Sequence, residues 1–282
     1  MKFRGYPLAH LPARAVMSAH VRLTRFRVEI QRRFPRWLGL PALGPYVQLY
    51  REDALFRTQI SVFNYYTTFF PKYDVRLVYQ VIAFDRQGKR LGTGEIALAA
   101  GESVQRSLSE VIPAKLDEFG LFSVMARPVA EHPEQVRQLG GTTCQFMTLY
   151  FPADSRAQAP QIIHSHKLFQ NFWMPKSQIV RESHISEDLS GRTLTEFYFL
   201  NSCPSKTEAV LHVLDGTTGK ELTHRILAIP GHGVGRILLP SSAFADSGKL
   251  LGFEYGFDRR ISHRKPIVFR HQRQGVINCN HS

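Results

Sequence analysis

The sequence lacks the signals that would direct it into or across a membrane. No apolar run approaches the roughly 20 residues needed to span a bilayer. His10, Pro12 and Arg14 interrupt the first twenty residues, so they do not read as a secretory signal. We therefore expect a cytoplasmic protein without a transmembrane segment, with peripheral association at a membrane as an alternative.

Cysteine is scarce, and familiar catalytic motifs are missing. Cys144, Cys203 and Cys279 are widely spaced and form no Cys-x-x-Cys pair, so neither a disulfide framework nor a thiolate zinc site is predicted. The sequence contains no GxSxG, Walker, HExxH or Rossmann glycine pattern. We assign no catalytic residue, and these absences favour a protein that is not an enzyme.

Acidic residues are nearly absent from the two ends of the chain. Residues 1–45 hold nine bases against one acid, Glu29, for a net charge of +8, and residues 259–282 hold six bases and no acid, for +6. The two ends together carry +14, so a total charge of +13 leaves −1 for residues 46–258. Such basic segments favour an anionic partner, which could be a membrane surface, a nucleic acid or an acidic protein. The arginines that we assign to this contact are Arg22, Arg25, Arg32, Arg33, Arg259 and Arg260.

Helical periodicity is also lacking after the first forty residues, where short β-branched and aromatic runs dominate. One run, Val75–Phe84, stops at Asp85-Arg86-Gln87-Gly88-Lys89, and another, Val210–Leu214, stops at a similar D…GK segment, Asp215–Lys220. Each pattern is typical of a strand that runs into a turn. The repeated turn suggests that the chain contains two copies of one module.

Three further matches follow the same order along the chain. The strands Thr58–Phe63 and Thr195–Leu200 both end at an asparagine, and Ile163-His164-Ser165 and Asn280-His281-Ser282 close the two units. At one constant offset, Gly101, Val104, Arg106 and Leu108 match Gly231, Val234, Arg236 and Leu238. We predict an all-β protein of two tandem antiparallel β-sandwich domains from an internal duplication, over residues 46–167 and 177–282. The alternative is one larger sandwich whose strands mix between the halves.

A segment of the second half resembles a known family. Pro266-Ile267-Val268-Phe269-Arg270-His271-Gln272-Arg273 is similar to the PIVxxHxR strand near the end of the sensory rhodopsin transducer family, and Leu200-Asn201 and Ile229-Pro230 lie where that family has comparable features. The resemblance implies a small cytoplasmic β-sandwich that oligomerises, so we include a homo-oligomer among the expected assemblies. The first half has no counterpart to this segment.

The N-terminal arm, residues 1–45, reads as basic and partly helical. Over residues 15–38, apolar residues recur every three or four positions, arginines occupy the remaining faces, and Pro35 should end or kink the helix. Such an amphipathic helix could lie on an anionic membrane or bind nucleic acid. The interpretation that we favour is a helix packed on a sandwich with a solvated basic face, because the charged faces of helices are ordinarily exposed to solvent.

Two apolar segments have no counterpart in the duplication: a loop of the first copy and the linker between the copies. The loop after Asn64 is rich in aromatic residues, and the linker at residues 168–176 is too apolar for a free tether. We expect both to lie at interfaces, with a ligand or partner groove between the two sandwiches. The residues that we assign to this interface are Tyr65, Tyr66, Phe69, Phe70, Tyr73, Phe172 and Trp173.

Twelve histidines raise a metal hypothesis. If His164 and His166 share a strand, their side chains point the same way and could bind one transition metal ion, with His184 or His281 as a third ligand. A cupin site would require an acidic residue shortly after this pair, and the sequence has none there. Our leading interpretation is a non-enzymatic binding or assembly protein, and the alternative is a metal-dependent enzyme at these histidines.

Overall fold

The computed structural model describes the body of the chain and shows that it is built from antiparallel β-sheets. The described residues are 46–64, 75–129, 146–153, 159–164, 166–167, 179–188, 191–202, 204–244, 250–258, 266–273, 275 and 277–281. The predicted N-terminal helix lies outside them. No helix in the described part of the chain is long and apolar enough to cross a membrane.

The first half of the chain forms two sheets. Its elements are β1 (Tyr46–Arg51), β2 (Phe56–Phe63), β3 (Arg76–Asp85), β4 (Arg90–Leu98), β5 (Ser103–Ser107), α3 (Leu108–Val111), β6 (Phe119–Val129), β7 (Phe146–Pro152), β8 (Gln161–His164) and β9 (His166–Lys167). The strand orders are β4-β3-β6-β1-β9 and β5-β2-β7-β8. In β2 and β3, buried and more exposed residues alternate, as expected for strands with one face on a core.

The second half forms two more sheets. Its elements are β10 (Ile179–Asp188), β11 (Arg192–Leu200), β12 (Thr207–Asp215), β13 (Glu221–Ile229), β14 (Val234–Pro240), η2 (Ser241–Phe244), β15 (Leu250–Asp258), β16 (Ile267–Gln272) and β17 (Ile277–His281). The strand orders are β13-β12-β15-β10 and β14-β11-β16-β17. These orders repeat those of the first half strand for strand, except for the added β9, and each of the four sheets takes its strands from one half only.

The turns that matched in the sequence have matching hydrogen bonds. Asp85 Oδ1 accepts the backbone N–H groups of Gln87 and Lys89 at 2.9 and 2.8 Å, and Asp215 Oδ1 does the same for two residues of its own turn. Gly88 and Gly219 both take positive φ, at 83° and 70°. The aspartate and glycine therefore serve to close each hairpin.

The asparagines that follow β2 and β11 have the same role in the two halves. Asn64 Nδ2 donates to the backbone carbonyls of Val75 and Ala99, both at 2.8 Å, while Asn201 Nδ2 donates to the carbonyl of Pro230 at 2.8 Å. Both asparagines are buried. Each side chain satisfies carbonyl groups where the strands leave the sheet, which explains why both strands end at this residue type.

The sequence match of Gly101 with Gly231 is wrong by one residue. The Glu102 amide bonds to the carbonyl of Ala99, and the Gly233 amide bonds to that of Pro230, so Gly101 is equivalent to His232. Both take positive φ, at 73° and 57°. The D…GK turn of the second half is one residue longer, so the residues from β4 to β5 correspond to residues of β13 and β14 one position later than this match places them.

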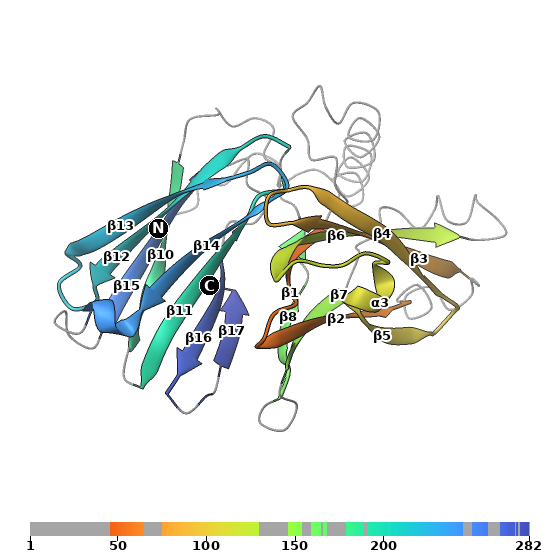
Figure 1. Ribbon diagram of the computed structural model, residues 1–282, viewed down its shortest axis with the longest axis horizontal. Helices are drawn as coiled ribbons and strands as arrows, with labels where there is room; N and C mark the ends of the chain where they lie inside the picture. The colour runs from red at the N-terminus through yellow and green to blue at the C-terminus, as the bar shows by residue number, and fades with distance from the viewer. Residues whose placement is uncertain are drawn as a thin grey trace, which may run out of the picture.

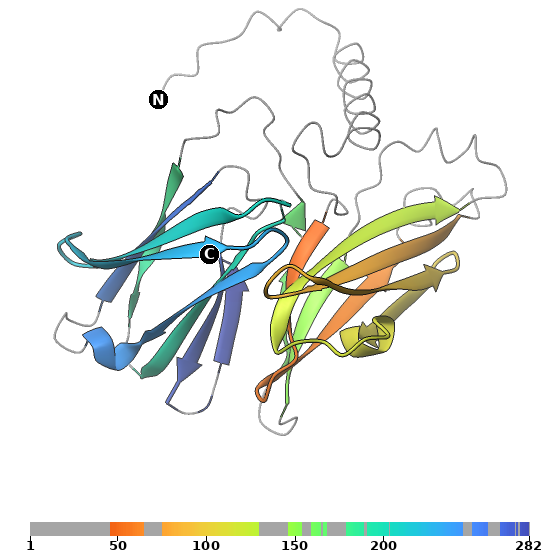
Figure 2. The same cartoon turned by 45° about the horizontal axis from the view of Figure 1, so that its top comes forward.

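Each half has a core between its two sheets, and a third core joins the halves. The first core includes Ile60 of β2 and Tyr79 of β3, and the equivalent core of the second half includes Phe197 of β11 and Leu211 of β12. The third core contains buried residues of both halves: Val47, Leu49, Phe56, Phe84, Phe119, Leu121, Tyr150, Ile163, Tyr198, Leu200, Val234, Ile267, Phe269 and Ile277. We call this third cluster the junction core. The two halves lie side by side in both ribbon views, with β17 next to β8 (Figures 1 and 2).

Candidate functional site

A buried arginine sits at the centre of the junction. Arg51 is the last residue of β1, and its side chain is only 2 % exposed. Its guanidinium lies 4.7 Å from the ring centre of Phe56, 5.4 Å from that of Tyr198 and 4.4 Å from that of Phe269. These rings come from both halves, so the cation is enclosed by the surface that joins them.

Two carboxylates pair with this arginine. Arg51 Nη1 lies 3.0 Å from Glu196 Oε1, across the junction, and Nη2 lies 2.7 Å from Asp53 Oδ2. Glu196 lies on β11 and also accepts hydrogen bonds from the Tyr198 hydroxyl, at 2.7 Å, and from His271 Nε2. Every charge in this cluster has a partner, as a buried ion pair requires. We call Arg51, Asp53, Glu196, Tyr198 and His271 the junction cluster.

The junction cluster shifts the pKa of its central carboxyl. Burial by itself would raise the pKa of Glu196, but the hydrogen bond from His271, the positive charge of Arg51 and the hydrogen bond from Tyr198 outweigh it and lower this pKa to about 2. Burial raises the pKa of the Tyr198 hydroxyl, so that hydroxyl remains protonated and donates. Glu196 is therefore ionised in the folded protein throughout the neutral range.

We expect stability to depend on Glu196 in acid. Because its folded pKa is depressed from 4.5 to about 2, its stabilising effect is present above pH 4.5 and is lost as the pH falls towards 2. The shift corresponds to about 3 kcal/mol of unfolding free energy. Denaturant unfolding at a series of pH values should show wild type losing this amount relative to Glu196→Gln. If the difference in the free energy of unfolding between wild type and Glu196→Gln stays constant as the pH falls from 4.5 towards 2, the charge of Glu196 does not stabilise the folded protein.

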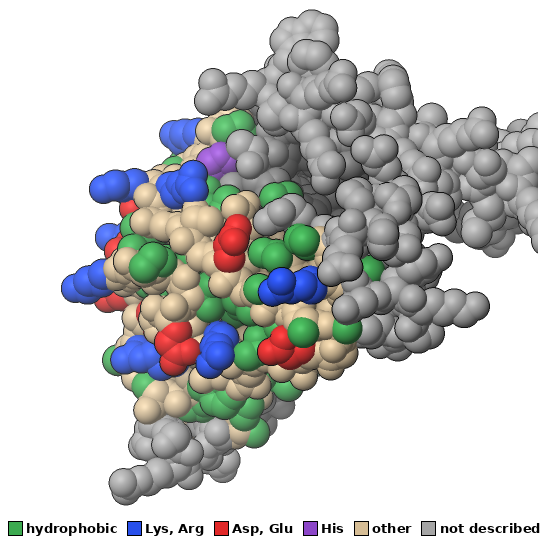
Figure 3. Space-filling view, turned by 90° about the vertical axis from the view of Figure 1, so that its right-hand side faces the viewer, with side chains coloured by type: hydrophobic (Ala, Val, Ile, Leu, Met, Phe, Trp, Pro, Cys, Tyr) green, Lys and Arg blue, Asp and Glu red, His purple; other side chains and the backbone are tan. Residues whose placement is uncertain are grey.

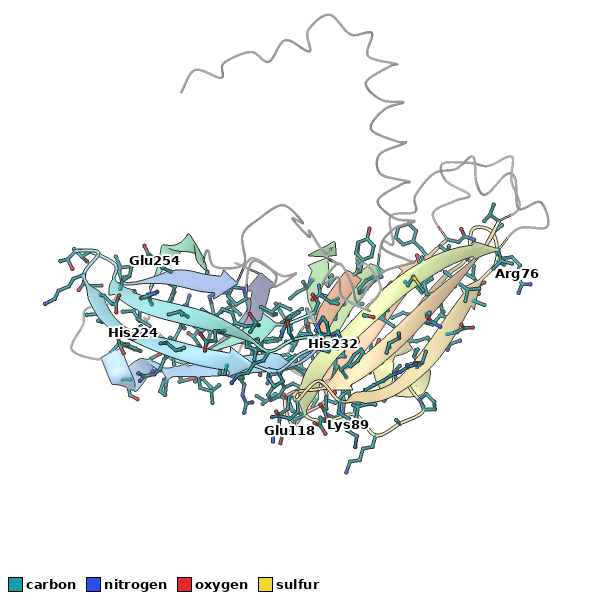
Figure 4. The ribbon with its side chains drawn as sticks, turned by 90° about the horizontal axis from the view of Figure 1, so that it is seen from above. Arg76, Lys89, Glu118, His224, His232 and Glu254 are labelled. Carbon is teal, nitrogen blue, oxygen red and sulfur yellow. The ribbon has the colours of Figure 1, made fainter. Side chains whose placement is uncertain are left out.

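A second contact joins the turns of the two halves. The Val234 amide donates to the Arg86 carbonyl at 3.0 Å, and the rings of Phe84 and His232 are 5.2 Å apart. His232 lies at the junction (Figure 4). Burial lowers its pKa, although its Nδ1–H donates to the Ser202 carbonyl at 3.1 Å. The His232 ring is therefore neutral and packs against Phe84 of the first half.

None of the interface or anion-binding residues predicted from the sequence lies in the part of the chain that the structure describes. The aromatic loop (Tyr65, Tyr66, Phe69, Phe70 and Tyr73), the linker residues Phe172 and Trp173 and the basic residues Arg22, Arg25, Arg32, Arg33, Arg259 and Arg260 all lie outside the described residues. Where the described residues of the two halves meet, buried side chains of the junction core pack against one another. A cavity of about 440 Å³ opens elsewhere, between β4, β5 and α3, and is lined in part by Glu95, Glu102, Arg106 and Glu110.

The four histidines predicted as metal ligands lie on four different sheets. His164 ends β8, opposite Met147, whereas His166 begins β9, opposite Val47 of β1. The premise that these two share one strand was wrong, because the chain changes sheets between them. His184 lies on β10 and His281 on β17, which belong to the two sheets of the second half.

Sequence reasoning missed the junction cluster. Arg51 and Glu196 are 145 positions apart, so no local spacing connects them. The available signal was weaker: Glu196 is a lone acid within the apolar strand Thr195–Leu200. No protein-family model matches this chain, and no curated protein is similar enough to match it.

Proposed function

We propose that this protein is a non-enzymatic binding or assembly protein, made of two tandem copies of one β-sandwich behind a basic arm that recruits an anionic partner. The repeated strand order of the two halves supports the duplication. The observation that carries the proposal is the junction core, because it unites the two copies into a single body with fixed geometry. Such a body suits a scaffold, on which binding elements are held at constant positions.

The distribution of charge supports recruitment through the arm. Residues 1–45 contain nine bases and one acid, whereas acids and bases are nearly balanced in residues 46–258, whose net charge is −1. Figure 3 shows basic and acidic side chains interspersed on the side of the first half that points away from the second half. At the other end of the chain, Arg270 is buried, which leaves fewer C-terminal bases for an anion. We therefore place the main contact with an anionic partner on the arm.

The segment that resembles the sensory rhodopsin transducer family adds to this proposal. It includes β16, which supplies Phe269 to the junction core and His271 to the junction cluster. In this chain a strand of that pattern joins one sandwich to another. We propose that the second half shares the sandwich fold of that family. We also propose that the surface through which such a sandwich would oligomerise packs, in this chain, against the first half.

Neutralising the arm should weaken binding to anionic surfaces. We expect a full chain with Arg22, Arg25, Arg32 and Arg33 all changed to glutamine to bind vesicles containing phosphatidylserine, or single- or double-stranded nucleic acid, on the order of 100-fold more weakly at low salt. Cosedimentation and fluorescence anisotropy over a salt series measure this loss and identify which of these partners is bound.

A matched variant provides the control for that test. Arg76, Arg86, Lys89 and Arg90 are four exposed bases of the described body. Changing these four to glutamine removes the same charge and should leave binding nearly unchanged. Equal losses in the two variants would show that net charge alone drives binding, and no salt-sensitive binding by wild type would reject the role of the arm.

A further inference from the structure

The outer face of the second half brings together two histidines and a glutamate. In β12, Ala209, Leu211 and Val213 point into the core, so the intervening His212 points outward. His212 is paired directly with His224 of β13, on the same face. Glu221 begins β13, on the same side of the hairpin. Figure 4 shows His224 on this half, well away from the junction.

The donor atoms of these three residues converge. Both His212 Nδ1 and His224 Nδ1 lie 2.9 Å from an oxygen of the Glu221 carboxylate, one on each oxygen. Among the described residues, they form the one group of three whose ligand atoms all lie within 4.8 Å of one another. Two imidazoles and a carboxylate are a donor set that zinc and related divalent ions bind in proteins, with the fourth position left to water or another ligand.

The neighbouring strand adds negative charge. Glu254 of β15 is the partner of His212 in the sheet, so its carboxylate lies on the same face. A second carboxylate beside the ligands favours a cation and can orient a ligating histidine. Surface ion pairs between histidine and glutamate contribute little to stability, so stabilisation of the hairpin does not account for the set.

The first half shows that the hairpin closes without these residues. The equivalent positions on β3 and β4 are Ile82, Arg90 and Thr93, since Ile82 pairs with Thr93 and Phe84 with Arg90, as His212 pairs with His224 and Leu214 with Glu221. None of the three is a ligand for a transition metal. The His/Glu set is therefore specific to the second half, and neither the turn nor the strand pairing requires it.

We propose that His212, Glu221 and His224 form a binding site for one divalent transition metal ion of the zinc type, held by the two Nδ1 atoms and the Glu221 carboxylate. Binding replaces the protons that the imidazoles share with the carboxylate. The ion retains an open position towards solvent, where water or a donor group of another molecule can bind. This site does not depend on the function proposed for the basic arm.

Zinc titration of the full chain tests the site. Competition with a chromophoric chelator should give one tight site per chain in wild type. Affinity should fall in His212→Gln/His224→Gln by more than the roughly 10–100-fold that loss of an outer-shell partner costs, and also in Glu221→Gln. The control is His164→Gln/His166→Gln, which removes two histidines from the site predicted by sequence and should bind zinc as wild type does.

Thermal unfolding separates loss of the ligand from loss of the fold. Without metal, His212→Gln/His224→Gln should unfold at the wild-type temperature, and zinc should raise the unfolding temperature of wild type only. The proposal is overturned if wild type takes up no stoichiometric zinc, if the His212/His224 variant keeps the tight site, or if only the His164/His166 variant loses it.

Discussion

Replacing Arg51 with methionine is expected to lower the free energy of unfolding by about 3–5 kcal/mol. Methionine fills much of the same space between the rings, but it leaves the buried Glu196 carboxylate without its cationic partner across the junction. Removing one member of a buried pair costs far more than the pair itself contributes, because the remaining charge stays desolvated. Urea unfolding at neutral pH measures the change.

Two further variants show whether the loss comes from the stranded charge. Arg57→Met removes an arginine whose side chain is 52 % exposed, and it should change stability by less than about 1 kcal/mol. Adding Glu196→Gln to Arg51→Met should recover part of the loss, because it removes the uncompensated charge. A strictly additive double variant would mean that Arg51 acts through packing alone.

Phe269→Ala is expected to cost about 3–5 kcal/mol, because it opens a cavity at the centre of the junction core. The Phe269 side chain is completely buried. Its ring centre lies 5.2 Å from those of Phe56 and Tyr150, both in the first half, and 5.7 Å from that of Tyr198. The substitution therefore removes packing on both sides of the junction.

The control for Phe269 lies on a neighbouring part of the same sheet. Leu238 of β14 is 46 % exposed, and Leu238→Ala should change the free energy of unfolding by about 0.5 kcal/mol or less. A Phe269→Ala variant as stable as this control would mean that the junction is loosely packed in solution.

Local chemistry explains which parts of the fold could be predicted. The D…GK turns and the asparagines at the ends of β2 and β11 act through hydrogen bonds to nearby backbone, so their sequence signals correspond directly to structure. The match of Gly101 to Gly231 failed because one added residue in the turn at Asp215–Lys220 shifts the pairing of later strands. Residue identity alone does not reveal such a shift.

The sites depend more strongly on tertiary structure. His164 and His166 were predicted to lie on one face of a strand because they are two positions apart in the sequence, whereas the structure places them on strands of two different sheets. Arg51 and Glu196 meet only when the two halves pack together. The pair His212 and His224 could have been found, because the two residues flank a recognised hairpin turn at positions that its register places opposite each other.

Hydrogen exchange of Phe269→Ala tests most directly the central claim, that the two halves form one folded body. Phe269 belongs to the second half, and β4 and β5 lie in the first half, outside the junction core. If the halves unfold together, amides of β4 and β5 lose protection in this variant along with those of β12 and β13. Protection that falls in the second half while β4 and β5 exchange as in wild type would contradict the claim and describe two independent domains.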